Sequence, residues 1–398
     1  MANVSSSNGL EKRPKLRFPG FDEPWKATAF GDIVHEFSNR TKVEDEDVLL
    51  SAAIEGMFLN TELFGHQRGA SNKGYKKIKY GTMVLSTQNL HLGNANVNQR
   101  FEHGMVSPAY KTYDISGCSI DLIAQWIKSD AAKRFFYNAT TVGASVCRRN
   151  VEWDTLYGQS LFLPSLPEQE KIANLLTLLS NRIEKQRQLI IALKKYKRGL
   201  LSQLIAQKKA FNTSREWKTV KLGHIFKERT ERAKGNETLL AVTISNGVQR
   251  RDEIDLKDNS SDDKSNYKCV YIGDIAYNTM RMWQGASGVS PYNGIVSPAY
   301  TIVTPIRPDA HNMTFWAYYF KYSPLVQTFQ KYSQGLTSDT WNLKFPQFSE
   351  ITVTMPSKYE QDKIAECLSV FDEHCKCEEG KLQVLFQVRT SLLQQLFI

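Results

Sequence analysis

The sequence predicts a mixed α/β (α+β) protein in which two globular domains of one fold are separated by two long helices. The chain has 398 residues, which exceeds the size of one typical domain. Its two halves repeat each other, and each half ends in a long segment with the apolar spacing of a coiled coil. We therefore expect an internal pseudo-two-fold duplication whose long helices pair as an antiparallel coiled coil.

The repeat has a main shift of 192 residues. The segment P-S-x-x-E-Q-x-K-I-A occurs at 164–173 and again at 356–365 with this shift. The same shift relates Trp25 to Trp217, Gly31 to Gly223, and Asn150 to Asn342. A shift of 190 relates the pentapeptide Val-Ser-Pro-Ala-Tyr at 106–110 and 296–300, and Trp126 to Trp316. Residues that recur at fixed positions, with divergent loops between them, predict two domains of one fold that contact different ligands.

This repeat divides the chain into five parts. They are an N-terminal tail (1–24), a first domain (25–165), a central spacer helix (166–210), a second domain (215–355) and a C-terminal spacer helix (356–398). Within the domains, Thr82–Ser86 and Val270–Asn278 read as strands, and Ile120–Phe136 and Thr314–Tyr332 read as helical. Pro324 predicts a break in the second helical segment.

Apolar residues follow a strict 4-3 spacing in both spacer helices, which indicates a coiled-coil seam rather than an ordinary amphipathic bundle helix. The first seam consists of Ile172, Leu176, Leu179, Ile183, Ile190, Leu193, Leu200 and Leu204. The second consists of Ile364, Leu368, Phe371, Cys375, Leu382, Leu385, Leu392 and Leu396. Polar residues interrupt equivalent positions of the two seams, and we expect them to fix the register: Gln186, Lys197, Glu378 and Arg389.

About 40 helical residues span roughly 60 Å, which is between one and two turns of B-DNA. The first helix is basic, with ten Lys/Arg and three Glu over 167–210, whereas 358–398 holds five Lys/Arg and seven Asp/Glu. Either the two helices attract each other through these faces, or the basic helix passes over DNA phosphates. Four apolar residues flank the seams and are expected to be exposed to partners: Leu189, Leu201, Leu393 and Phe397.

Composition favours a polyanionic partner and a reducing compartment. Lys and Arg number 51 and Asp and Glu 41, which gives a net charge of +10. The six cysteines form no CxxC pair, and no apolar run reaches the length of a membrane helix, so we expect a cytoplasmic protein without membrane contact. No nucleotide-binding, hydrolase or methyltransferase motif occurs, and no metal-ligand spacing, so a binding role is favoured over catalysis.

The chain resembles the DNA-specificity subunits of type I restriction–modification systems. The resemblance rests on Leu16–Phe21 (LRFPGF) followed by Trp25, on Trp217–Ile225 (WKTVKLGHI), on both Val-Ser-Pro-Ala-Tyr segments, and on both P-x-x-x-E-Q-x-K-I-A helix starts. Lys197–Leu201 (KRGLL) resembles the usual end of the first spacer helix. The similarity covers nearly the whole chain.

The resemblance implies a non-catalytic subunit of an adenine-DNA methyltransferase and endonuclease complex. Each target-recognition domain would read one half of a bipartite, asymmetric site on double-stranded DNA. The helices would set the gap between the two half-sites and would dock two modification subunits. Restriction subunits would join this complex. S-adenosylmethionine, ATP and magnesium are expected on those partners and no cofactor on this chain. The alternative is a stand-alone scaffold whose two diverged ligand-binding domains are spaced by a coiled coil.

Base reading needs donors such as Arg, Asn and Gln on loops that reach the major groove. The segment after the strand Val270–Asn278 and its counterpart in the first domain differ, as half-site readers should. The candidates for DNA contact are Asn278, Arg281, Trp283, Gln284, Gln88, Asn89, His91, Arg148, Arg149, Asn150 and Asn342. The Gly-rich basic loop that contains Arg68 and Lys73 suits phosphate contact.

Overall fold

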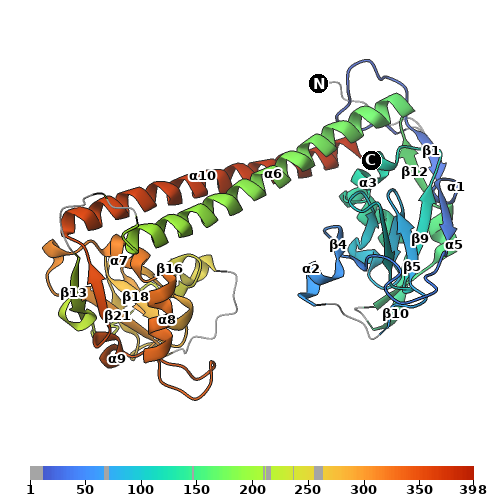
Figure 1. The fold of residues 1–398 in the computed structure, drawn as a ribbon. Helices are drawn as coiled ribbons and strands as arrows, with labels where there is room; N and C mark the ends of the chain where they lie inside the picture. The colour runs from blue at the N-terminus through green and yellow to red at the C-terminus, as the bar shows by residue number, and fades with distance from the viewer. Residues whose placement is uncertain are drawn as a thin grey trace. The chain divides into compact units, whose positions relative to one another are not determined.

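The computed structural model describes residues 12–66, 71–145, 148–208, 211, 217–235, 237–254 and 263–398 (Figure 1). The chain forms two compact units, Met1–Arg187 with Gly380–Ile398, and Gln188–Glu379. Two long helices, α6 (Leu166–Ile205) and α10 (Lys358–Leu396), run from one unit into the other. Each unit therefore contains half of α6, half of α10 and a globular domain.

The domain of the first unit is built on an antiparallel sheet with the order β2-β9-β6-β7. These strands are β2 (Val34–Phe37), β9 (Tyr110–Ile115), β6 (Met83–Ser86) and β7 (Ala95–Val97). The two-stranded pairs are β1 (Lys26–Ala29) with β12 (Ser160–Leu163), β3 (Leu50–Ala52) with β4 (Met57–Leu59), β5 (Lys76–Lys79) with β8 (His103–Val106), and β10 (Thr140–Ser145) with β11 (Arg148–Val151). The short helices are α1 (Phe30–Ile33), α2 (Asn60–Phe64), η1 (Leu90–Leu92), α3 (Ile120–Trp126), α4 (Asp130–Asn138) and α5 (Trp153–Gly158).

The domain of the second unit has an equivalent sheet with the order β14-β21-β18-β19. These strands are β14 (Phe226–Glu228), β21 (Tyr300–Pro305), β18 (Ile275–Asn278) and β19 (Ser287–Val289). The pairs are β13 (Lys218–Lys221) with β22 (Thr352–Met355), β15 (Leu240–Thr243) with β16 (Gly247–Arg250), and β17 (Lys268–Val270) with β20 (Gly294–Val296). The short helices are η2 (Leu222–His224), η3 (Arg251–Glu253), η4 (Met282–Gln284), η5 (Pro308–Ala310), α7 (Met313–Tyr319), α8 (Ser323–Tyr332) and α9 (Phe345–Ser349).

The helical segments of both domains are broken. In the second domain the break precedes Pro324, which lies in the first turn of α8, as predicted. The first domain breaks as well, so the single helical segment predicted over Ile120–Phe136 is wrong: Ser129 Oγ accepts a hydrogen bond from Ala132 N and caps α4. The N-cap residues of α3 and α7, Ser119 and Asn312, are 193 residues apart. Trp126 is therefore equivalent to Tyr319, and the predicted match of Trp126 with Trp316 is wrong.

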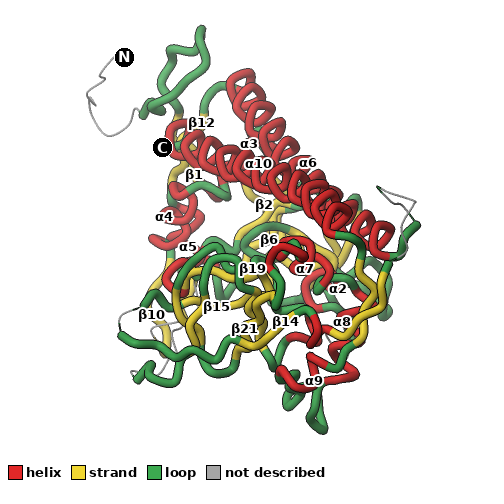
Figure 2. Tube along the Cα trace, turned by 90° about the vertical axis from the view of Figure 1, so that its left-hand side faces the viewer, coloured by secondary structure: helices red, strands yellow, loops and turns green. Residues whose placement is uncertain are grey.

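The predicted coiled coil is confirmed, and the two long helices lie side by side (Figure 2). The buried seam residues include Ile172, Leu176, Ile183, Ile190, Leu204, Ile364, Leu368, Cys375 and Leu396, and the other seam residues are half-buried. The helices run antiparallel, because Ser180 contacts Arg389 and Lys197 contacts Asp372.

The ends of the spacer helices belong to the cores of the domains. Leu393 and Phe397 pack in the core of the first unit with Trp25 and Phe136. Leu201 packs in the core of the second unit. The prediction that these three helix residues are exposed is therefore wrong, because periodicity identifies the seam but cannot show which second face enters a domain. Leu189, which lies away from both domain cores, is exposed as predicted.

The polar interruptions of the seams connect the spacer to the domains. Lys197 Nζ donates to Asp372 Oδ1 at 2.5 Å, and the Tyr318 hydroxyl of α7 donates to Asp372 Oδ2 at 2.6 Å. At the equivalent place of the first unit, Arg389 donates to Ser180 Oγ at 3.3 Å and to Gln125 Oε1 of α3 at 3.2 Å. We call these two groups the clasps. Each one joins both long helices to the first helix that packs on them.

Candidate nucleic-acid interface

The repeated glutamine of the P-x-x-x-E-Q motif fixes the start of each spacer helix. Gln361 Nε2 donates to Pro356 O at 3.1 Å, and its Oε1 accepts from Asn312 N at 2.9 Å. In the first unit, Gln169 makes the same two bonds, to Pro164 O at 2.9 Å and from Ser119 N at 2.8 Å. The motif therefore ties each spacer helix to the N-terminus of α3 or α7.

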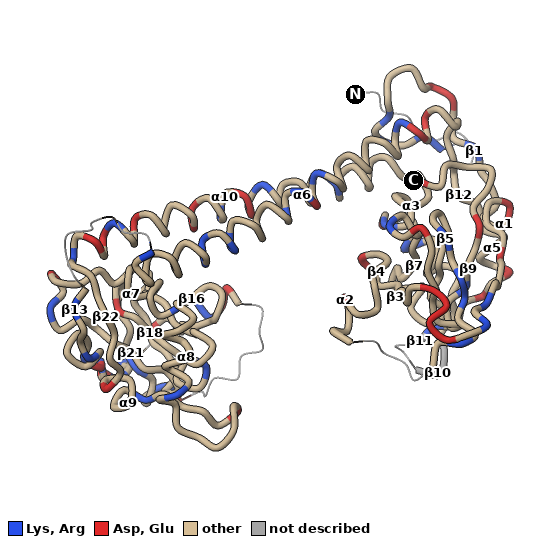
Figure 3. Tube along the Cα trace, viewed as in Figure 1, with Lys and Arg blue, Asp and Glu red and all other residues tan. Residues whose placement is uncertain are grey.

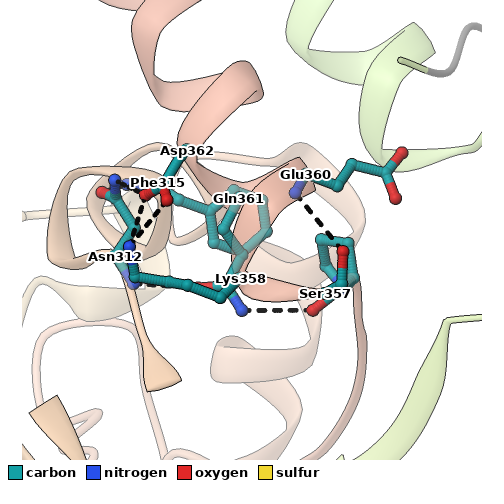
Figure 4. A network of polar contacts seen from close by, with 8 residues as sticks. Asn312, Phe315, Ser357, Lys358, Glu360, Gln361 and Asp362 are labelled. Atoms are coloured by element: carbon teal, nitrogen blue, oxygen red, sulfur yellow. Dashed lines mark hydrogen bonds and ion pairs between the residues drawn. The ribbon is translucent and has the colours of Figure 1, made fainter. Parts of the chain in front are cut away.

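A network of polar contacts surrounds this glutamine in the second unit (Figure 4). Asn312 Oδ1 accepts from Phe315 N at 3.0 Å and caps α7, while its Nδ2 donates to Asp362 Oδ1 at 2.6 Å. Lys358 Nζ donates to the same carboxylate at 2.7 Å. The hydrogen bonds from Asn312 and Lys358 hold the pKa of Asp362 below its ordinary value.

The N-terminal LRFPGF motif is held by the glutamate of the first helix start. Arg17 forms a two-pronged ion pair with Glu168, with both N–O distances at 2.8 Å, and the carboxylate is fully buried. The backbone N–H of Leu16 donates to Gln395 O of α10 at 3.1 Å. The motifs that support the resemblance thus act as structural connections, and the residues predicted to contact DNA lie elsewhere in each domain.

The Val-Ser-Pro-Ala-Tyr segment forms a turn between β20 and β21 that anchors a neighbouring loop. Thr279 Oγ1 donates to Ala299 O of this turn at 2.8 Å, and Lys268 Nζ donates to Tyr300 O at 2.9 Å. The first domain repeats both contacts, from Thr87 to Ala109 O at 3.0 Å and from Lys76 to Tyr110 O at 2.8 Å. The pentapeptide therefore anchors the segment that follows β6 or β18.

We call that segment of the second domain, Asn278–Gly285, the second reading turn, after the DNA contact that the sequence predicts for it. Asn278 Oδ1 accepts from Met280 N at 3.0 Å, and Trp283 Nε1 donates to Met280 O at 3.0 Å, so both predicted contact residues stabilise the turn itself. Arg281 and Gln284 are exposed. Neither side chain has a hydrogen-bond or ion-pair partner in the described part of the chain. These two are the donors that the turn presents to solvent.

The loop 333–342 lies against the second reading turn. Leu343 N donates to Thr279 O at 2.9 Å, and the rings of Trp341 and Trp283 meet edge to face, 5.2 Å apart. Asn342 is half-buried, and its side-chain oxygen is buried. The structure therefore brings Asn278, Arg281, Trp283, Gln284 and Asn342 together, with Arg281 and Gln284 exposed.

The equivalent segment of the first domain, Ser86–Gly93, is called the first reading turn. Gln88 and Asn89 are exposed in it, and His91 is half-buried. Burial and the charge of Arg149 both lower the pKa of His91, which places these two residues near each other. The first reading turn therefore presents amide donors where the second presents a guanidinium.

The hairpin of β10 and β11 takes the place of the loop 333–342. Arg149 donates to the hydroxyl and carbonyl oxygens of Thr140 at 2.7 Å and lies 4.2 Å from the ring centre of Tyr137, so it stabilises the hairpin. Asn150 is exposed on β11, and Lys73 is exposed before β5. Arg68 and the side chain of Arg148 lie outside the described residues.

Figure 3 shows Lys and Arg along α6 and a larger share of Asp and Glu along α10. Lys194 pairs with Glu379 at 2.6 Å and Lys197 with Asp372, so part of the basic face is directed at the partner helix.

Within the described ranges, no helix is long and apolar enough to cross a membrane, and no three His, Cys, Asp or Glu side chains gather as metal ligands.

A family model described as "Type I restriction modification DNA specificity domain" matches residues 214–387. This part of the chain is therefore similar to a DNA specificity domain. This match confirms the resemblance that the sequence motifs indicate. Specificity subunits of this family are themselves non-catalytic. None of the curated proteins matches the sequence.

Solved structures support the fold over nearly the whole chain. The S subunit of a type I restriction-modification system from M. genitalium is 15% identical, with a TM-score of 0.56 over 97% of this chain and 99% of that one. A structure described as underlying complex assembly and conformational transition of the type I R-M system is 14% identical, with a TM-score of 0.55 over 96% and 99%. An HsdS subunit from Thermoanaerobacter tengcongensis is 15% identical, with a TM-score of 0.48 over 96% and 97%. The specificity-domain match and the fold shared with the first two of these structures agree.

Proposed function

We propose that the chain is the sequence-specific DNA-binding subunit of a type I restriction–modification complex, in which each domain reads one half of a bipartite, asymmetric site. The single observation that supports this most strongly is the contrast between the two reading turns. Their anchors are equivalent in both domains, whereas the exposed side chains differ: Gln88 and Asn89 in one, Arg281 and Gln284 in the other.

The hydrogen-bond donors of the two reading turns sit on anchored segments, which favours base reading over general attraction to phosphates. Arg pairs with guanine, and Asn or Gln pairs with adenine, through two hydrogen bonds of fixed geometry. Such pairs need donors held in place, and Thr87 and Thr279 hold the starts of the two turns. The antiparallel helices would then set the distance between the half-sites, with the clasps fixing each domain on the spacer.

In this proposal the chemistry belongs to other subunits. Methylation of a base inside a duplex requires the base to be flipped out, which the reading protein does not do itself. Two modification subunits that carry S-adenosylmethionine, and restriction subunits that use ATP and magnesium, would join this chain on DNA in the cytoplasm.

The docking site that we propose for the modification subunits lies on the long helices. Two exposed apolar positions recur in both units at a shift of 192 residues: Leu178 matches Val370, and Tyr196 matches Val388. The half-sites differ, so exposed features common to both units should contact something that is the same on both sides. Two copies of one partner meet that condition.

Co-expression with a modification subunit tests both parts of the proposal. Mapping of methyladenine by single-molecule sequencing in a methylation-free host should yield one split, asymmetric motif with a fixed gap. No motif despite an assembled complex would refute the DNA-reading role, and failure to assemble would favour a stand-alone scaffold. Leu178→Asp should reduce the number of bound modification subunits from two to one in native mass spectrometry. Leu189→Asp is the control. Leu189 is also exposed, but its equivalent in the other unit is the charged Lys381, so this position is not a shared apolar feature and two modification subunits should still bind.

A further inference from the structure

Two equivalent lysines bind backbone carbonyls inside the two domains. Lys128 follows α3 and donates to Ile54 O at 2.8 Å, to Ala95 O at 3.1 Å and to Asn96 Oδ1 at 2.6 Å. Lys321 follows α7, 193 residues later, and donates to Ile244 O at 3.0 Å and to Gly285 O at 2.5 Å. Each amine thus joins two segments that are distant in sequence.

The segments that they join include the reading turns. Gly285 is the last residue of the second reading turn and closes η4 through its N–H bond to Met282 O at 2.8 Å. Ala95 lies two residues beyond the first reading turn, and its N–H donates at 2.9 Å to the carbonyl oxygen of Gly93, the last residue of that turn. Ile54 and Ile244 lie in equivalent hairpin turns, between β3 and β4 and between β15 and β16. Each lysine therefore ties the end of its reading turn to the neighbouring hairpin.

A cation at this position is costly for the fold. Desolvation lowers the pKa of both lysines to about 8. The charged groups that face Lys128 are Arg389, which lowers its pKa further, and Glu55, which raises it. Lys321 faces the cation Lys197. An apolar side chain would avoid this cost. Both domains nevertheless keep a lysine here, although most of their loops have diverged, so the ammonium has a role that both domains share.

We propose that Lys128 and Lys321 are positioning residues for DNA reading, each of which fixes the reading turn of its own domain against the adjacent hairpin. An ammonium suits this role because one nitrogen carries three donors and can hold carbonyls from two segments at once. The inference rests on the proposed function, since it assigns how that reading surface is kept in place.

The pH dependence distinguishes positioning from a purely structural role, because the two effects have opposite signs. Between about pH 8 and 10.5 the unfolded lysine still holds its proton while the folded one has lost it, so the contribution of this group to folding stability rises with pH. Over the same rise the reading turn loses its ammonium anchor, so discrimination between bases of that half-site should fall. A lysine that matters only for stability would not produce this divergence.

The test uses the chain assembled with its modification subunit and a duplex library in which the two half-sites are varied separately. Lys321→Met should reduce base discrimination in the second half-site about tenfold and leave the first unchanged. Lys128→Met should do the reverse, so each variant is the other's control. Lys321→Arg should retain discrimination in the second half-site at pH 9, where the wild type loses it in both half-sites.

Three results have distinct meanings. Unchanged discrimination in both methionine variants, or an equal loss in both half-sites, would overturn the inference. If a methionine variant does not assemble, the wild type compared at pH 7 and pH 9 provides the test, and equal discrimination at both pH values would overturn it. Absence of any split recognition sequence in the wild type would instead refute the proposed function.

Discussion

Removal of the carboxylate from the clasp of the second unit should loosen α7 from the spacer. Asp372 accepts one hydrogen bond from Lys197 and one from Tyr318, and burial together with that bond raises the pKa of Tyr318, so the phenol stays protonated and donating. Asp372→Ser removes both charged bonds and leaves the mostly buried Lys197 without its counterion. Hydrogen bonds to charged groups contribute about 1.5–3 kcal/mol each.

The size of the effect follows from the exposure of the group. Because the Asp372 side chain is 43% exposed, solvent screens part of both bonds, and we expect a total loss of about 2 kcal/mol. That loss corresponds to roughly 30-fold faster opening in hydrogen–deuterium exchange. The peptide that contains α7 should show it, whereas the peptide that contains α3 in the other unit should not change.

The reciprocal substitution is the matched test. Ser180 occupies the position of Asp372 in the first unit, where Arg389 has a hydroxyl instead of a carboxylate as its acceptor. Ser180→Asp should stabilise the packing of α3 by about 1 kcal/mol. Unchanged exchange of α7 in Asp372→Ser would refute the clasp. If the clasps also fix the number of base pairs between the two half-sites, Asp372→Ser should add methylation at sites in which this number differs by one.

Three further predictions concern the reading surface and the start of α10. Arg281→Ala should cost about 1–3 kcal/mol of binding on the cognate site with little effect on stability, and an equal loss on unrelated DNA would indicate a phosphate contact instead. Trp341→Ala removes the edge-to-face pair with Trp283 and should destabilise the loop 333–342 by about 1–2 kcal/mol, visible as faster exchange of that loop alone. The folded pKa of Asp362 lies below its ordinary value, so its stabilising contribution should be present above about pH 4 and lost as pH falls through the folded pKa. Asp362→Asn should flatten the acid limb of the stability profile, and an unchanged limb would contradict this assignment.

The sequence predicts the repeat and the seam well because both are periodic. A 4-3 spacing that recurs after 192 residues fixes which helix face is buried, and Pro324 marks the break between two helices for a steric reason. Periodicity does not show tertiary packing, so Leu201 and Leu393 were expected at the surface although they enter the domain cores.

The candidate reading residues could be predicted only by location. Spacing places Asn278–Gln284 and Gln88–His91 in equivalent turns, but it does not distinguish side chains that support a turn from those that face solvent. Arg149 is bound to Thr140, whereas Arg281 is exposed. Lys128 and Lys321 were missed because the shift changes to 193 in this region, and a comparison of the two halves that allows that change would have found them.

The central claim is that each domain reads its own half-site and that the two domains, joined by antiparallel helices, read their halves in opposite directions. It is tested most directly by replacing residues 217–350 with a second copy of residues 25–158 and mapping methyladenine in the assembled complex. We predict an interrupted palindrome in which both halves equal the half read by the first domain. A motif that keeps the original second half, or a direct repeat of the first half, would contradict the claim.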